Sequence, residues 1–152
     1  MGITQEDRKN FINRIKGPVS NEYKDNKILA IVTIAQAILE SGWGKNAIGN
    51  NIFGIRSTKS WKGKVQYITT REVIKGKNEK QHNQAFRDYD SIEACIKDHN
   101  KILSLPRYKN VISADTYEKA CIALEVGGYS TDPMYAETLI SIIKHNKLEQ
   151  YI

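Results

Sequence analysis

The chain has 152 residues and a mass of 17.3 kDa, a size that favours one domain folding without disulfide or metal staples. Its hydrophobic fraction of 40% and charged fraction of 26% exclude an intrinsically disordered chain. The 23 Lys and Arg residues exceed the 17 Asp and Glu residues by six, which favours an anionic partner without choosing between nucleic acid, acidic lipid and a cell-wall polymer.

Two helices are predicted in the first third of the chain. Residues 5–15 place apolar side chains on one face, and the Gly-Pro pair at 17–18 is expected to end that helix. Residues 26–41 form the strongest pattern, because apolar residues cover most of the helix surface and indicate a central, buried position. Its longest apolar run, five residues, is too short to span a bilayer, so no membrane insertion is expected. Gly42 and Gly44 then end the helix.

A β-hairpin is predicted in the middle of the chain. Residues 65–74 are rich in β-branched and aromatic residues, residues 75–78 supply a turn, and residues 81–89 form the returning strand.

Helical pattern resumes after the hairpin. Asp90 is an N-cap candidate with Glu93 as its capping-box partner. Two further helices are predicted, one over residues 115–125 and one beginning at the Asp-Pro pair at 132–133, with proline at its first position.

These elements predict one domain over residues 1–152. Its fold class is mainly α with a small β-hairpin lobe, in which residues 1–60 and 90–152 form a helical lobe and residues 61–89 form the β-lobe.

Cysteine and histidine spacing gives no sign of a metal site. Cys95 and Cys121 lie in helical patterns without a CxxC spacing, so free buried thiols are favoured over a disulfide or a metal pair. His82, His99 and His145 are too scattered for a ligand set. We expect neither a metal nor another cofactor.

A narrow polar stripe follows the central apolar helix. On a helical wheel, Thr33, Gln36 and Glu40 fall within an arc of about 60°. Such a stripe must face water, a cleft or a buried polar network. Glu40 stands at the helix C-terminus beside apolar residues, where the dipole and desolvation both raise a carboxyl pKa, as a general acid requires. The alternative is an exposed glutamate at a fraying helix end.

Six blocks in register carry a family resemblance. They read AQAILESGWG at 35–44, NNIFGI at 50–55, FRDYDS at 86–91, DH at 98–99, LPRY at 105–108 and GYSTDPMYA at 128–136. Together they resemble the signatures of the bacterial glucosaminidase domains of glycoside hydrolase family 73. The resemblance implies a lysozyme-like fold with a substrate groove between the helical lobe and the β-lobe, and a catalytic role for three residues.

The resemblance implies that Glu40 is the general acid and that Tyr129 supports catalysis from the groove wall. Glu72, in a Thr-x-Glu segment of the hairpin, matches the family's second carboxylate. Glycoside hydrolysis commonly uses two such carboxylates, one on each side of the bond that is cut. A solvated strand residue is the alternative for Glu72, and Asp88 and Asp90 compete with it. For Tyr129 the alternative is an aromatic side chain that packs on the core.

Five residues are predicted to bind substrate. Trp43, Phe53 and Tyr135 offer flat apolar faces on which sugar rings stack, or they pack in the core. Asn51 could hydrogen-bond an acetamido group or hold a turn, and Gln36 lies on the polar stripe that leads to Glu40.

The function implied is hydrolysis of the β-1,4 bond between N-acetylglucosamine and N-acetylmuramic acid in bacterial peptidoglycan. A muramidase or lytic transglycosylase of the same superfamily, and a non-catalytic wall-binding module, are the alternatives. No nucleic-acid motif is found, so the expected partners are glycan strands and, by charge, anionic wall polymers. We expect a monomer that acts at the bacterial cell wall. No signal peptide is visible in this sequence, and a catalytic fragment of a larger secreted protein or a phage-delivered lysin would explain this.

Overall fold

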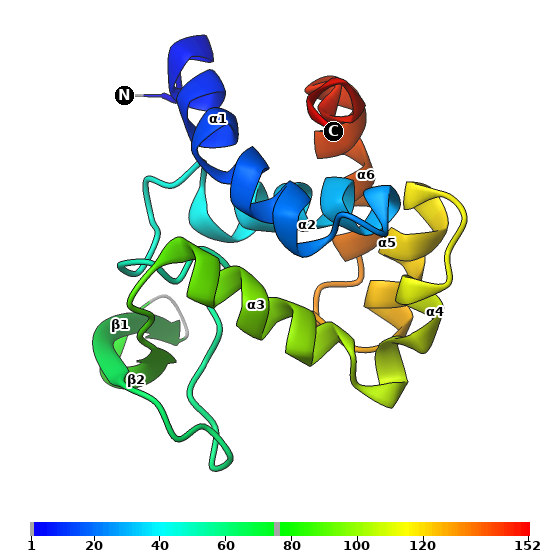
Figure 1. Cartoon of the computed structure of the whole chain (residues 1–152). Helices are drawn as coiled ribbons and strands as arrows, with labels where there is room; N and C mark the ends of the chain where they lie inside the picture. The colour runs from blue at the N-terminus through cyan, green and yellow to red at the C-terminus, as the bar shows by residue number, and fades with distance from the viewer. Residues whose placement is uncertain (1, 75–76) are drawn as a thin grey trace.

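A computed structural model describes residues 2–74 and 77–152, and it describes side chains outside residues 70–82. The elements in chain order are α1 (Gln5–Glu22), α2 (Lys27–Ser41), β1 (Val65–Ile74), β2 (Lys77–Arg87), α3 (Ile92–Leu103), η1 (Pro106–Tyr108), α4 (Lys109–Ile112), α5 (Tyr117–Val126), α6 (Tyr135–His145) and η2 (Leu148–Tyr151). The helices form one body, the hairpin lies at its side, and both chain ends lie at the top of the view (Figure 1).

Helix α2 is the buried centre that its sequence predicts. It packs against α1, α5 and α6, and every residue from Leu29 to Ile38 is buried. The side chain of Asn26 caps its first turn by accepting a hydrogen bond from the backbone N–H of Leu29. Gly42 ends the helix in the left-handed region, with φ of 55°.

Helix α1 is longer than predicted, because it continues through the Gly17-Pro18 pair to Glu22. Proline removes one backbone hydrogen bond, but the preceding residue is a glycine, which has no Cβ to meet the proline ring. The last turn is held by Val19, whose side chain is fully buried. Burial of the helix face therefore outweighs the local signal for a break.

The hairpin is confirmed, with a different returning strand. Strands β1 and β2 are antiparallel, from Val65 opposite Arg87 to Ile74 opposite Lys77. The predicted turn was too long, because Lys77 and its neighbour already belong to β2, and the rest of that turn lies outside the described residues. The strand ends at Arg87 rather than at residue 89, since the Arg87 N–H bonds to the Ile55 carbonyl in a preceding loop.

Two predicted helix starts were misplaced. Ser91, not Asp90, is the N-cap of α3, since its hydroxyl accepts from the backbone N–H of Ala94. Helix α6 begins at Tyr135, two residues after Pro133, because the Asp132 carboxylate bonds the backbone N–H of Met134 in a turn before the helix. The short elements η1, α4 and η2 were not predicted.

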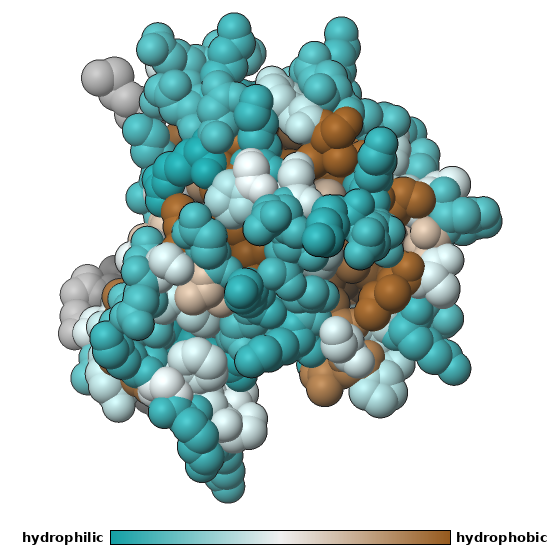
Figure 2. Space-filling model, in the orientation of Figure 1, coloured by the Kyte–Doolittle hydropathy of each residue, from teal (hydrophilic) through white to brown (hydrophobic). Residues whose placement is uncertain are grey.

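The two cysteines are buried as predicted, and the surface visible in Figure 2 is mainly hydrophilic. Both cysteines are free and buried, and burial raises the pKa of the Cys95 and Cys121 thiols to about 12. None of the described helices has the length and apolarity needed to cross a membrane. The face in Figure 2 is mainly hydrophilic, with apolar side chains gathered over α4 and α5 at its right side, where Ile112, Ile122 and Val126 are exposed.

Candidate active site

An open cleft of about 630 Å³ lies at the C-terminal end of α2. Its walls come from α2, the loop between α2 and β1, the end of α3 with η1, and the loop before α6. The residues that line it include Glu40, Phe53, Arg56, Arg107 and Tyr129. The predicted general acid, one predicted binding aromatic and the predicted supporting tyrosine thus meet at one concave surface.

Glu40 presents its carboxylate to this cleft. Gly54 adopts φ of +62°, a conformation that favours glycine, and its Cα position lies next to the Glu40 carboxylate, since a Cβ there would be in van der Waals contact with Oε2 at 4.0 Å. Desolvation by the surrounding protein raises the pKa of Glu40 above its ordinary value. No described residue forms an ion pair or hydrogen bond with it that would offset the shift, and the acid holds its proton to higher pH than a free glutamate.

The aromatic residues behind the cleft rest on His99. Its ring stacks on Phe53 with centroids 4.2 Å apart and meets Tyr129 edge to face at 6.2 Å. Tyr129 also stacks on Tyr135 at 5.8 Å. Phe53 and Tyr129, the two aromatic predictions that line the cleft, are therefore held by one buried imidazole.

A chain of buried hydrogen bonds fixes that imidazole. The Tyr23 hydroxyl lies 2.6 Å from His99 Nδ1, and His99 Nε2 lies 2.9 Å from Gln36 Oε1. Gln36 Nε2 in turn donates to the Tyr135 hydroxyl at 2.9 Å. Because the amide oxygen can only accept, His99 carries its proton on Nε2 and accepts from Tyr23 on Nδ1. Burial lowers the pKa of His99 to about 3, so the ring is neutral.

The polar stripe of α2 therefore divides between two surroundings. Thr33 and Gln36 are fully buried, whereas Glu40, one turn after Gln36, reaches the cleft. A buried polar network and a cleft were both among the surroundings that the sequence allowed for this stripe.

Four predicted substrate-binding residues do not line the cleft. Gln36 and Tyr135 are committed to each other in the buried chain. Asn51 is also buried, where it bonds the backbone of Ile55 and the carbonyl of Arg87 and so holds the loop, the second of its two predicted roles. Trp43 packs on α1, with the Arg8 guanidinium carbon and the Phe11 ring 5.0 Å and 6.5 Å from its ring centroid.

The predicted second carboxylate stays a prediction. The backbone of Glu72 pairs with Lys80 next to an irregularity in β1, and its side chain is outside the described part of the chain. Among the competitors, Asp90 is exposed and pairs with Lys64 at 2.9 Å. Asp88 is partly buried near the start of the hairpin, where its N–H bonds the Lys64 carbonyl.

Comparison with known proteins assigns the family. Residues 17–148 match the glucosaminidase model, described as mannosyl-glycoprotein endo-beta-N-acetylglucosaminidase. The chain belongs to the glucosaminidase family. The peptidoglycan hydrolase FlgJ of Salmonella typhimurium is 38% identical over 93% of this chain and 47% of its own length, and the exo-glucosaminidase LytG of Bacillus subtilis is 35% identical over 93% and 52%. This chain spans about half the length of these curated relatives.

Two solved domains share the fold. The glycoside hydrolase domain of Salmonella FlgJ is similar with a TM-score of 0.79 and 37% identity, over 92% of this chain and 97% of that one. The catalytic domain of the Listeria monocytogenes autolysin Auto is similar with a TM-score of 0.81 and 32% identity, over 100% and 91%. The predicted family and its lysozyme-like fold class are confirmed.

One cluster in this glucosaminidase domain was not predicted from sequence. Arg87 forms an ion pair with Asp98 at 2.8 Å, and the Tyr89 hydroxyl donates to the same carboxylate. Arg87 also donates to the Arg56 carbonyl and the Thr58 hydroxyl, which line or adjoin the cleft. The FRDYDS and DH blocks contain this arginine and this aspartate, but their spacing does not reveal that they pair.

Removing Asp98 should destabilise the domain. Asp98→Ala leaves Arg87, whose side chain is 11% exposed, without its partner, and breaking such a buried pair costs about 3–5 kcal/mol. The measurement is the free energy of unfolding in denaturant. Asp90→Ala is the matched control, because its pair with Lys64 is exposed and should contribute less than about 1 kcal/mol. Equal losses in the two variants would contradict the role of the Arg87 cluster.

Proposed function

We propose that the chain is a hydrolase of bacterial peptidoglycan that cuts the β-1,4 bond between N-acetylglucosamine and N-acetylmuramic acid. The observation that carries this proposal is Glu40, a carboxyl group with a raised pKa and no described partner, at a cleft in a glucosaminidase-family domain. The names of two relatives, a peptidoglycan hydrolase and an exo-glucosaminidase, support the substrate and the sugar.

In this proposal the cleft is the substrate groove, and Glu40 gives its proton to the glycosidic oxygen as the bond breaks. Phe53 and Tyr129 form the groove wall beside it, and Tyr129 positions the acetamido group or a water molecule. Tyr129 lines the cleft and its hydroxyl has no hydrogen-bond partner among the described residues, which supports this role. Glu72 would supply the second carboxylate from the hairpin.

We propose the extent, oligomeric state and place of action of the domain together with this activity. Residues 1–152 act as one catalytic domain, and the buried apolar residues of the helical body, which form one connected cluster, support this. The domain works as a monomer at the cell wall, delivered by secretion or by phage.

The proposal is tested by digesting purified peptidoglycan and following soluble fragments and new reducing ends with time. We expect both to rise together, and we expect the Glu40→Gln variant to lack both. An endo-acting enzyme releases a ladder of glycan fragments, whereas an exo-acting one releases small sugars from the start. Release of neither product by the folded protein would contradict the proposed activity and favour a wall-binding module.

Salt should weaken attachment to the wall. The net charge of +6 draws the domain to anionic polymers through exposed charges, which salt screens over about 8 Å at 0.15 M. We expect the fraction that sediments with intact cell walls to fall as salt rises past about 0.15 M. Sedimentation that does not change with salt would show that sugar contacts alone drive binding.

A further inference from the structure

The cleft carries a surplus of positive charge beside Glu40. Arg56, Arg87 and Arg107 all line it, while Glu40 is its one lining carboxylate among the described residues. Arg87 is neutralised by Asp98. Arg56 and Arg107 are exposed, and neither forms an ion pair with any described carboxylate. Two guanidinium groups are thus open to a ligand in the same cleft as the proposed acid.

We propose that Arg56 and Arg107 form a carboxylate-binding subsite, which selects glycan strands by the acidic substituent on muramic acid. This inference rests on the proposed function. Muramic acid carries a lactyl carboxyl group, which is free in peptide-free strands and extended by an acidic peptide in intact peptidoglycan. Arginine binds such groups through two parallel N–H donors.

Both arginines are held in place before any ligand binds. The Arg56 guanidinium lies 5.4 Å from the Phe86 ring centroid. The backbone of Arg56 forms a β-bridge with Phe86, and its carbonyl accepts a hydrogen bond from Arg87 Nε. The Arg107 guanidinium carbon lies 4.8 Å from the centroid of the Tyr108 ring. Arg107 follows Pro106 in the short helix η1. A cation–π contact of this kind restrains the guanidinium group while the side chain stays exposed to a ligand. Pre-ordered groups lose less entropy on binding.

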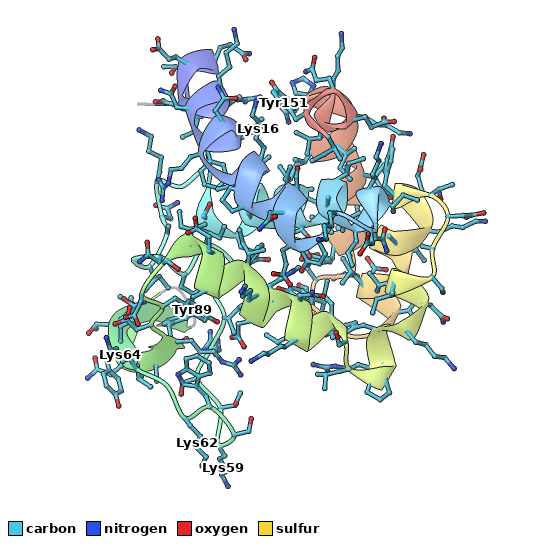
Figure 3. The ribbon with its side chains drawn as sticks, in the orientation of Figure 1. Lys16, Lys59, Lys62, Lys64, Tyr89 and Tyr151 are labelled. Atoms are coloured by element: carbon cyan, nitrogen blue, oxygen red, sulfur yellow. The ribbon has the colours of Figure 1, made fainter. Side chains whose placement is uncertain are left out.

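Other cations in the same loop lack this arrangement. Lys59 and Lys62 lie at the tip of the loop between α2 and β1, away from the helical body (Figure 3), and neither lines the cleft. They carry the same charge as the arginines. They therefore separate an effect of the subsite from an effect of overall charge.

The test measures kcat/KM for the parent and for Arg56→Gln, Arg107→Gln and the double variant. The three substrates are intact peptidoglycan, peptide-free glycan strands, and peptidoglycan whose carboxyl groups have been amidated chemically. We expect each single variant to lose about threefold to tenfold on intact peptidoglycan, mainly through KM, and the double variant to lose more. On the amidated substrate the parent and variants should be equal. Lys59→Gln should stay within about twofold, and melting temperatures should not change.

The peptide-free strands identify which carboxylate is bound. Loss of activity in the variants on intact peptidoglycan alone assigns a carboxylate of the peptide, and loss on the peptide-free strands alone assigns the lactyl carboxylate. Loss on both shows that the subsite accepts the carboxylate in either position. Unchanged kcat/KM in the double variant on both anionic substrates, or an equal loss on the amidated one, would overturn the subsite. Those results would leave the proposed hydrolase intact, whereas a parent inactive on all three substrates would overturn the function itself.

Discussion

Replacing Glu40 by Gln is expected to lower peptidoglycan hydrolysis at least about a hundredfold, because general-acid help contributes two to four orders of magnitude in rate. Glutamine keeps the shape of the side chain at the end of α2 and removes its transferable proton. Glu137→Gln, an exposed change on α6, is the control and should retain the parent rate. Activity of Glu40→Gln within about threefold of the parent would remove Glu40 from the mechanism.

The pH dependence of the hydrolysis rate, in the parent and in Glu40→Gln, tests the same role of Glu40. Since desolvation raises the pKa of Glu40, the parent rate should fall as pH rises through that raised value, and this limb should be absent from any residual activity of the variant.

The raised pKa of Glu40 also affects stability, because the ionised carboxylate is the form that the folded state disfavours. Any stability that Glu40 contributes is therefore fully present below its unfolded pKa and lost as pH rises through its folded pKa. Glu40→Gln should unfold like the parent at acidic pH and at a higher temperature at pH 7.

Replacing Glu72 by Gln should depress turnover strongly and leave substrate affinity almost unchanged, if this residue is the base or stabilises an oxocarbenium-like state. A milder loss is expected if the acetamido group of the sugar is the nucleophile and Glu72 only orients it. The measurement is kcat and KM on purified peptidoglycan, with the melting temperature recorded for each variant. The folded variant should lose kcat rather than gain KM.

A surface glutamate would behave differently. Its replacement should cost under about 0.5 kcal/mol in stability and almost nothing in rate. Wild-type turnover in Glu72→Gln would exclude Glu72, and Asp88, which is partly buried near the start of the hairpin, would be the next residue to replace.

The central helix was predictable because its signals agree. Apolar residues cover most of α2, Asn26 and Gly42 mark its two ends, and Glu40 is the one ionisable side chain in it after Lys27. The same local reasoning failed where tertiary contacts decide the outcome. Burial of Val19 carries α1 through Pro18, although the Gly-Pro pair alone favours a break.

The rest of the site depends on partners that no local pattern identifies. Gln36 was placed on the correct stripe, but its commitment to His99 and Tyr135 requires α2, α3 and α6 to meet. The aromatic residues predicted to bind substrate differ in position for the same reason. Phe53 lies over His99 at the cleft, whereas Trp43 packs against α1. Periodicity identifies a buried or polar face, and it does not identify which side chain lies opposite.

The most direct test of the proposed cleavage is the identity of the sugar at each new reducing end, read by mass spectrometry after borohydride reduction of the digest. We expect reduced N-acetylglucosamine at the ends released by the parent and no such ends from Glu40→Gln. Reduced muramic acid would instead show cleavage of the other β-1,4 bond by a muramidase, and 1,6-anhydromuramic acid would show a lytic transglycosylase. Either of these products would contradict the account.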